Sequence, residues 1–85
     1  HNQLRLAIMS VLVTVEEADF NFLLERTGAT RGNLSVQITK LKEAGYINVN
    51  KSFKDNYPNT ACSITPAGIG AFEKYVEAIK GYLKK

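Results

Sequence analysis

The chain has 85 residues, enough for one domain with a modest hydrophobic core and near the lower limit for independent stability. Its composition is that of an ordinary globular protein without repeats, and its longest apolar run is too short to span a bilayer. The single cysteine excludes an internal disulfide and suits a reducing cytosol, and no signal peptide is recognisable. We therefore expect one cytoplasmic domain over residues 1–85 that does not interact with membranes.

The net charge of +3 is modest, but the charges are unevenly distributed. Between residues 30 and 54, five basic side chains accompany one acidic side chain, a net charge of +4. Between residues 16 and 26, four acidic side chains accompany one basic side chain, a net charge of −3. This asymmetry predicts an acidic partner for one side of the molecule.

Residues 2–15 form a segment that is apolar on nearly every side. Its length favours a helix, although the β-branched residues Val11, Val13 and Val15 would also suit a strand. A helix without a polar face needs cover on more than one side, so we expect a second subunit to provide part of it.

A helix of about two turns is predicted over residues 20–27. Asp19 or Asn21 can cap its N-terminus, and Gly28 is placed to end it. Only Ala29 and Thr30 then separate it from the next helical segment. Such a short connection is typical of a helix-turn-helix.

A third helix is predicted over residues 31–44, with Thr30 as its N-cap and Gly45 after its end. The buried stripe of this helix recurs at i, i+4 and i+7: Leu34, Ile38 and Leu41. The face opposite this stripe is unusual because most of its side chains are short and uncharged, whereas an ordinary solvated face would carry more Glu and Lys.

Residues 46–65 change to a period of two and predict a β-hairpin, with "YINVNKSF" and "TACSIT" as strands and "KDNYPN" as the turn region. Cys62 falls on the inward face as a structural thiol. Thr65 and Pro66 then begin a closing helix over residues 66–83. The expected fold is therefore α+β, in the order α-α-α-β-β-α.

Two segments, "FNFLLERTGATRGNLSVQITKLKEAGYINVNKSF" and "SITPAGIGAFEKYVEAI", carry a family resemblance. Over residues 4–83 the chain resembles the winged helix-turn-helix domain of small prokaryotic, especially archaeal, MarR/ArsR-type transcriptional regulators. The resemblance implies a third helix that reads the DNA major groove, a hairpin "wing" on the backbone or minor groove, and terminal helices that form a homodimer. The wing departs from the family pattern, because relatives usually carry Arg-rich tips and "KDNYPNT" contains Lys54 as its only base.

The outward face of the third helix suits the major groove on physical grounds. Short polar groups can approach base edges, amides can bond adenine, and the methyl groups of Val36 and Thr39 can meet a thymine methyl. Arg31 can pair with a phosphate or guanine, or instead form a salt bridge with Glu25. Tyr57 at the wing tip can contact the sugar-phosphate backbone or pack under Pro58. The residues expected to contact double-stranded DNA are Thr30, Arg31, Gly32, Asn33, Ser35, Val36, Gln37, Thr39, Lys40, Lys51, Lys54 and Asn56.

The closing helix carries an apolar seam with steps of three and four residues, as in a coiled coil. This seam either packs on its own domain or, together with the first helix, forms a symmetric dimer, which accounts better for the amount of apolar surface. The residues expected at the dimer interface are Leu4, Ile8, Val11, Ile69, Phe72, Val76, Ile79 and Leu83.

Catalytic features are missing from the sequence: we find no nucleophile–base pair, metal-ligand spacing or phosphate-binding loop. We therefore expect no enzyme, no metal and no cofactor, and a small-molecule effector cannot be named. The leading hypothesis is a dimeric, sequence-specific DNA-binding transcriptional regulator. The alternative is a winged helix that mediates protein–protein contacts within a transcription-related assembly.

Overall fold

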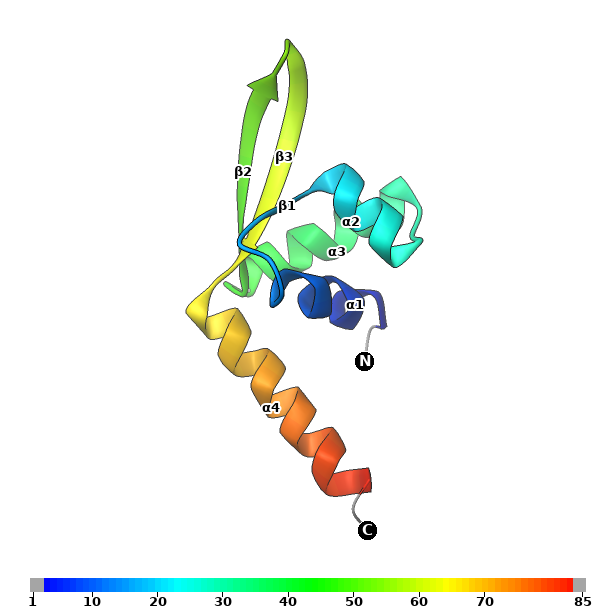
Figure 1. The fold of residues 1–85 in the computed structure, drawn as a ribbon, viewed down its shortest axis with the longest axis vertical. Coiled ribbons are helices and arrows are strands. Elements are labelled where there is room, and N and C mark those ends of the chain that lie inside the picture. The colour runs from blue at the N-terminus through cyan, green and yellow to red at the C-terminus, as the bar shows by residue number, and fades with distance from the viewer. Residues whose placement is uncertain (1–2, 84–85) are drawn as a thin grey trace.

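Four helices and a three-stranded antiparallel sheet make up the computed structural model, which describes residues 3–83 apart from the side chains of residues 54, 82 and 83. The sheet has the strand order β1-β3-β2 (Figure 1). The predicted α+β winged helix fold is confirmed, with one additional short strand. In chain order the elements are α1 (Gln3–Leu12), β1 (Ala18–Asp19), α2 (Phe20–Thr27), α3 (Arg31–Glu43), β2 (Ile47–Lys54), β3 (Tyr57–Ile64) and α4 (Pro66–Leu83).

The first helix ends at Leu12, three residues before the predicted end, and position 2 of the prediction lies outside the described residues. The chain turns after Leu12, where the amide of Thr14 donates to the carbonyl of Val11 (3.1 Å) and its hydroxyl donates to the same oxygen (2.7 Å). This turn brings Ala18 opposite Cys62 and Asp19 opposite Ala61 to form β1. The same turn therefore accounts for both differences from the prediction, the earlier end of α1 and the additional strand β1.

The ends of α2 and α3 follow from capping chemistry. Asp19 Oδ1 accepts from the amide of Phe22 (2.7 Å), and Gly28 ends α2 with φ of 69°. At the end of α3, Gly45 has φ of 80°, a left-handed conformation that favours glycine. The amides of Gly45 and Tyr46 donate back to the carbonyls of Lys42 and Leu41, which is the Schellman pattern.

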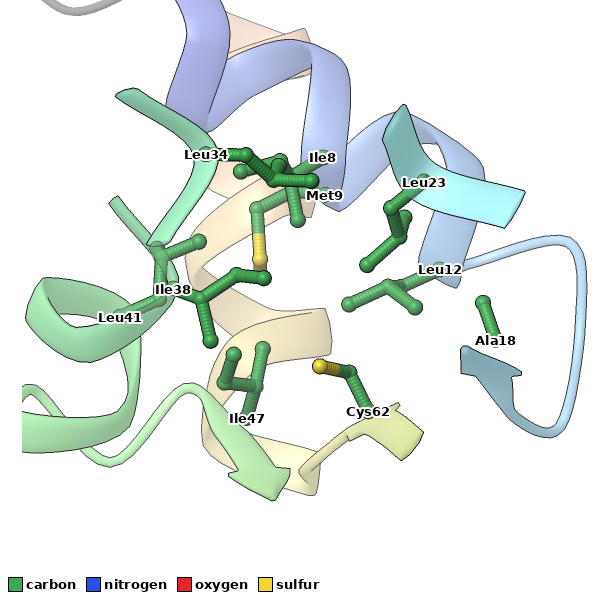
Figure 2. Packing of buried hydrophobic residues seen from close by; sticks show 10 residues of the cluster. All are labelled: Ile8, Met9, Leu12, Ala18, Leu23, Leu34, Ile38, Leu41, Ile47 and Cys62. Carbon is green, nitrogen blue, oxygen red and sulfur yellow. The ribbon is translucent and has the colours of Figure 1, made fainter. Parts of the chain in front are cut away.

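The hydrophobic core lies where α1, α2, α3 and the base of the sheet meet (Figure 2). Cys62 is fully buried in it, and burial together with the nearby charge of Glu17 raises the pKa of its thiol to about 11. The predicted structural thiol is thus a protonated core side chain. The core residues are Ile8, Met9, Leu12, Ala18, Leu23, Leu34, Ile38, Leu41, Ile47 and Cys62.

The hairpin of β2 and β3 extends well beyond the helices, at one end of a molecule 53 Å long (Figure 1). Its register is continuous from Ile47 opposite Ile64 to Lys54 opposite Tyr57. Asp55 and Asn56 make the two-residue turn, both with positive φ (52° and 68°), as a type I′ turn requires. Such a turn matches the twist of the strands and fixes the direction of the tip.

The start of α4 is joined to the end of α3. Thr65 Oγ1 accepts from the amide of Gly68 (3.0 Å) and donates to the carbonyl of Gly45 (2.7 Å), while the Thr65 amide donates to the carbonyl of Tyr46 (3.0 Å). A Cβ at Gly68 would collide with the same Tyr46 oxygen. From this joint α4 runs away from the other elements toward the end opposite the hairpin (Figure 1).

Candidate nucleic-acid interface

The buried stripe of α3 holds the helix against the core. Leu34, Ile38 and Leu41 are buried as predicted, and Figure 2 shows them directed toward the side chains of α1 and Ile47. The N-terminus of α3 is capped by Thr30, whose Oγ1 accepts from the amide of Asn33 (3.2 Å). The opposite face of α3 is therefore turned away from the core.

That outward face, which we call the α3 face, consists of side chains that are exposed without exception. Val36 is 50% exposed, an unusual state for an apolar side chain at the middle of a helix. Thr39 donates its hydroxyl to the carbonyl of Ser35 (3.0 Å) and so has a fixed orientation. The exposed carboxylate of Glu43 follows on the same side in the last turn of the helix. The α3 face consists of Arg31, Gly32, Asn33, Ser35, Val36, Thr39 and Lys40.

Arg31 contacts α2 and not the acid that the sequence offered as an alternative partner. Its Nη2 donates to Asn21 Oδ1 (3.5 Å), and its guanidinium lies 5.8 Å from the centre of the Phe20 ring. Both contacts leave the residue exposed. Arg31 is thereby held at the N-terminal end of the α3 face, where amide dipoles favour a bound anion.

Gln37 departs from the expected contact set because it is only 9% exposed. It lies three residues after Leu34 and four before Leu41, on the edge of the buried stripe, and the neighbouring elements cover it. Its Oε1 is fully enclosed without a hydrogen-bond partner. The carbonyl oxygen of Gln37 is therefore not available to base edges in this conformation, and we leave this residue out of the α3 face.

The wing exposes two aromatic side chains beside the polar groups that the sequence placed there. Lys51 and Asn56 are exposed, and the side chain of Lys54 lies outside the described residues. Tyr57 is 75% exposed and is not packed under Pro58, which corrects one of the two alternatives for this residue. Phe53, which the sequence reasoning did not select, is 78% exposed. Its signal was available: the period-two pattern of β2 places it on the face of Ile47 but beyond the core.

The expected dimer residues differ in how far their own domain covers them. Ile8 is fully buried in the core of its own chain, so its assignment to an interface is corrected: the other elements of the domain already cover that side of α1. Leu4, Val11 and Phe72 are partly buried against the same core. Ile69 and Ile79 are exposed and Val76 is half-buried, whereas the Leu83 side chain lies outside the described residues.

An apolar groove of about 440 Å³ lies between α1 and α4. Part of the predicted seam of α4 thus borders a surface that its own domain leaves open. The groove is lined by Gln3, Leu6, Ala7, Ser10, Phe72, Tyr75, Val76, Ile79 and Lys80.

Two other kinds of site were searched for within the part of the chain that the structure describes. No group of three or more His, Cys, Asp or Glu side chains there could hold a metal ion. No helix among those residues is both long and apolar enough to cross a membrane.

Comparisons with known proteins agree with this geometry. A family model described as a winged helix DNA-binding domain matches residues 4–83. An uncharacterized protein of Methanocaldococcus jannaschii is 35% identical over 75 residues, which cover 88% of this chain and 82% of that protein.

Solved structures show the same fold. A transcriptional regulator homologue from Pyrococcus horikoshii superposes with a TM-score of 0.89 and 28% identity, covering 98% of this chain and 82% of its own. The Bacillus subtilis regulator PadR, solved in complex with operator DNA, gives a TM-score of 0.79 at 14% identity, covering 88% of this chain and 48% of its own. Because the family model spans nearly the whole chain, the protein belongs to the winged helix DNA-binding domain family.

Proposed function

We propose that the protein is a sequence-specific transcriptional regulator that binds double-stranded DNA as a homodimer, with α3 in the major groove and the wing on the backbone or minor groove. The observation that carries this proposal is the α3 face. Between Arg31 and Lys40 it is exposed and carries no carboxylate, with one cation at each end of that stretch; Glu43, in the last turn of α3, is the first acidic side chain on this side. A solved structure of the same fold also supports this proposal, since PadR was solved with operator DNA.

The side chains of the α3 face divide into positioning and reading groups. Arg31 and Lys40 suit phosphates, and the open N-terminus of α3 at Gly32 suits close approach of a phosphate. Asn33 has an amide that can bond adenine, and Val36 offers methyl groups to thymine. Phosphate contacts fix the position of the protein on DNA, whereas the base contacts give sequence preference.

The homodimer is proposed from the surface of α4. Ile69 and Ile79 are exposed, and the groove between α1 and α4 is apolar and open. Two copies related by a twofold axis can cover these surfaces mutually. Such a dimer would present two α3 faces, which predicts a palindromic operator with half-sites about one helical turn, 34–36 Å, apart.

The reading role is tested by Val36→Glu. Duplexes are first selected by the wild-type protein from a randomised library. The variant should lose specific binding while its thermal unfolding stays unchanged, because residue 36 is exposed and a carboxylate would face bases and phosphates. Unchanged affinity for the selected duplex would remove α3 from the groove.

The positioning role is tested by Lys40→Ala, with Lys51→Ala as the equivalent change in the wing. Each should weaken binding to all duplexes about equally and reduce the slope of log affinity against log salt by roughly one. A change in sequence preference with an unaltered salt slope would assign that lysine to base reading.

The dimer is tested by sedimentation of the wild-type protein at micromolar concentration beside Ile79→Lys. We expect a dimer that the lysine dissociates, since burial of an isoleucine contributes about 1.5–3 kcal/mol. A 9.4 kDa monomer for the wild-type chain would exclude both the dimer and the palindromic operator.

The alternative, a protein–protein interaction module, is favoured by one observation, the base-poor wing with its exposed aromatic side chains. Salt dependence separates the two functions. Binding to duplex DNA that weakens steeply with salt supports the regulator, whereas an absence of duplex binding at low salt supports the module.

A further inference from the structure

The two most exposed large apolar side chains among the described residues both lie at the tip of the wing. Phe53 is 78% exposed and Tyr57 is 75% exposed. Nearer the base of the hairpin, Ile47 and Cys62 are buried, and Val49 and Ile64 are partly buried against the core. An exposed aromatic pair at the outermost point of the molecule therefore calls for a partner.

The two aromatic rings lie on opposite faces of the hairpin. In the register, Phe53 is opposite Pro58, and this pair shares a face with Ile47 and Cys62, because side chains of a strand alternate. Figure 2 shows Ile47 and Cys62 directed into the core, so this face is the one turned toward the helices. Tyr57 pairs with residue 54 on the other face, so Tyr57 points away from the groove when Phe53 faces it, and the sugar-phosphate contact considered for Tyr57 is not part of this arrangement.

The face on which Phe53 lies is fixed by the backbone register. The ladder between β2 and β3 continues to the last pair before the turn, and the turn itself has only two residues, Asp55 and Asn56. The register therefore decides the face of the hairpin on which the Phe53 side chain lies, all the way to the turn.

The size and charge of this patch select its occupant. Phe53 and Pro58 together are far smaller than the roughly 1,000 Å² that a specific protein interface buries, whereas a single apolar side chain suffices as a wedge in a DNA groove. Lys51 lies two residues before Phe53 on the same face, and Thr60 is opposite Lys51. A cation and a hydroxyl thus lie beside the ring on the same face, and the acidic residue of the tip, Asp55, is in the turn.

We propose that Phe53 is the groove-contacting residue of the wing: its ring, supported by Pro58, packs as an apolar wedge against the minor groove of duplex DNA. The inference rests on the proposed function and adds a contact to it. In this contact, apolar packing takes the place of the contacts with phosphate that further basic side chains would make. It contributes to affinity without contributing to the salt dependence, because no phosphate charge is neutralised by the ring.

The chain contains no tryptophan, so a single indole can report on each face of the tip. Phe53→Trp places it on the face turned toward the helices, and Tyr57→Trp places it on the opposite face as the matched control. Acrylamide quenching of each variant is measured free and bound to the duplex selected by the wild-type protein. We expect the indole at position 53 to become protected on binding and the indole at position 57 to stay accessible.

Affinity gives the second measurement. Phe53→Ala should weaken binding to the selected duplex by roughly tenfold with an unchanged salt slope, and Tyr57→Ala by less than about twofold. Both residues are exposed, so circular dichroism should show the wild-type fold for both variants.

The outcomes separate this inference from the proposed function. Wild-type binding with equal quenching at positions 53 and 57 overturns the wedge and leaves the regulator intact. Protection of position 53 in concentrated protein without DNA assigns the patch to a second copy and also overturns it. If the wild-type protein binds no duplex in a salt-dependent manner, the proposed function and the wedge fail together.

Discussion

The helices α3 and α4 begin with the same residue type, but their first turns are used differently. The Thr30 hydroxyl accepts one local bond, from Asn33, and the first turn of α3 remains open to solvent. The Thr65 hydroxyl links the start of α4 to the end of α3, since it accepts from Gly68 and donates to Gly45. Identical capping chemistry thus leaves one helix start free for an anion and fixes the other to the end of α3.

This difference assigns separate tasks to the two helix starts. The start of α4 sets the direction in which α4 leaves the domain, because it is bonded to the residues that end α3. The proposed dimer uses α4 and the proposed groove contact uses α3. The joint formed by Gly45, Tyr46, Thr65 and Gly68 therefore determines how the two α3 faces would be oriented in such a dimer.

The largest expected effect is at Gly68, the most crowded position of the joint. Gly68→Ala should destabilise the protein by about 3 kcal/mol, because its Cβ would collide with the Tyr46 carbonyl oxygen. Gly70→Ala is the matched control: no atom lies within 4 Å of a Cβ there, and alanine is the better helix former by about 1 kcal/mol. Urea unfolding of both variants makes the comparison, and equal stability of the two would contradict the crowding.

A smaller effect distinguishes the two threonine caps. Thr65→Ala should cost about 2 kcal/mol, since the Gly68 amide and the Gly45 carbonyl both lose a partner, and Thr30→Ala should cost about 1 kcal/mol. Thr65→Ser keeps the hydroxyl and should restore most of the loss. Thermal unfolding measures all three variants. A larger loss of stability for Thr30→Ala than for Thr65→Ala would contradict the greater structural importance of the Thr65 hydroxyl.

The smallest effect is a gain on the buried side of α3. Gln37→Met removes an enclosed amide oxygen that has no partner and keeps a side chain of similar length. We expect stability to rise by about 1 kcal/mol, measured by urea unfolding, with no change in DNA affinity. Destabilisation by methionine would show that the amide has a partner in the folded protein. Loss of DNA binding with an intact fold would instead return Gln37 to the contact set.

The sequence predicts those parts of the fold that depend on local chemistry. The bounds of α2 and the starts of α3 and α4 coincide with Asp19, Gly28, Thr30 and Thr65, residues that cap helices through their own side chains or backbone. The end of α1 and the existence of β1 depend on pairing with β3, which is more than 40 residues away in the chain. A two-residue strand has no periodicity from which it could be predicted.

The sequence predicts which residues lie at the centre of the buried and outward faces of α3, but not the burial of residues at the boundary between these faces. The projection of α3 assigned Val36 to the outward side and Leu34 to the core, as the structure has them. Gln37 is at the edge between these faces, so only the packing of neighbouring elements decides its burial. Ile8 illustrates the same limit, because an apolar helix does not reveal which side its own domain covers.

Because Cys62 is buried and is the only cysteine of the sequence, the reactivity of its thiol reports on unfolding. Alkylating reagents attack thiolates, and in the native state this thiol is both enclosed and, with its pKa of about 11, almost wholly protonated at neutral pH. Labelling therefore proceeds through opened molecules, and where closing outpaces alkylation its rate measures their equilibrium fraction. Mass spectrometry of labelled protein, free or mixed with DNA, would thus read stability directly in a cell extract.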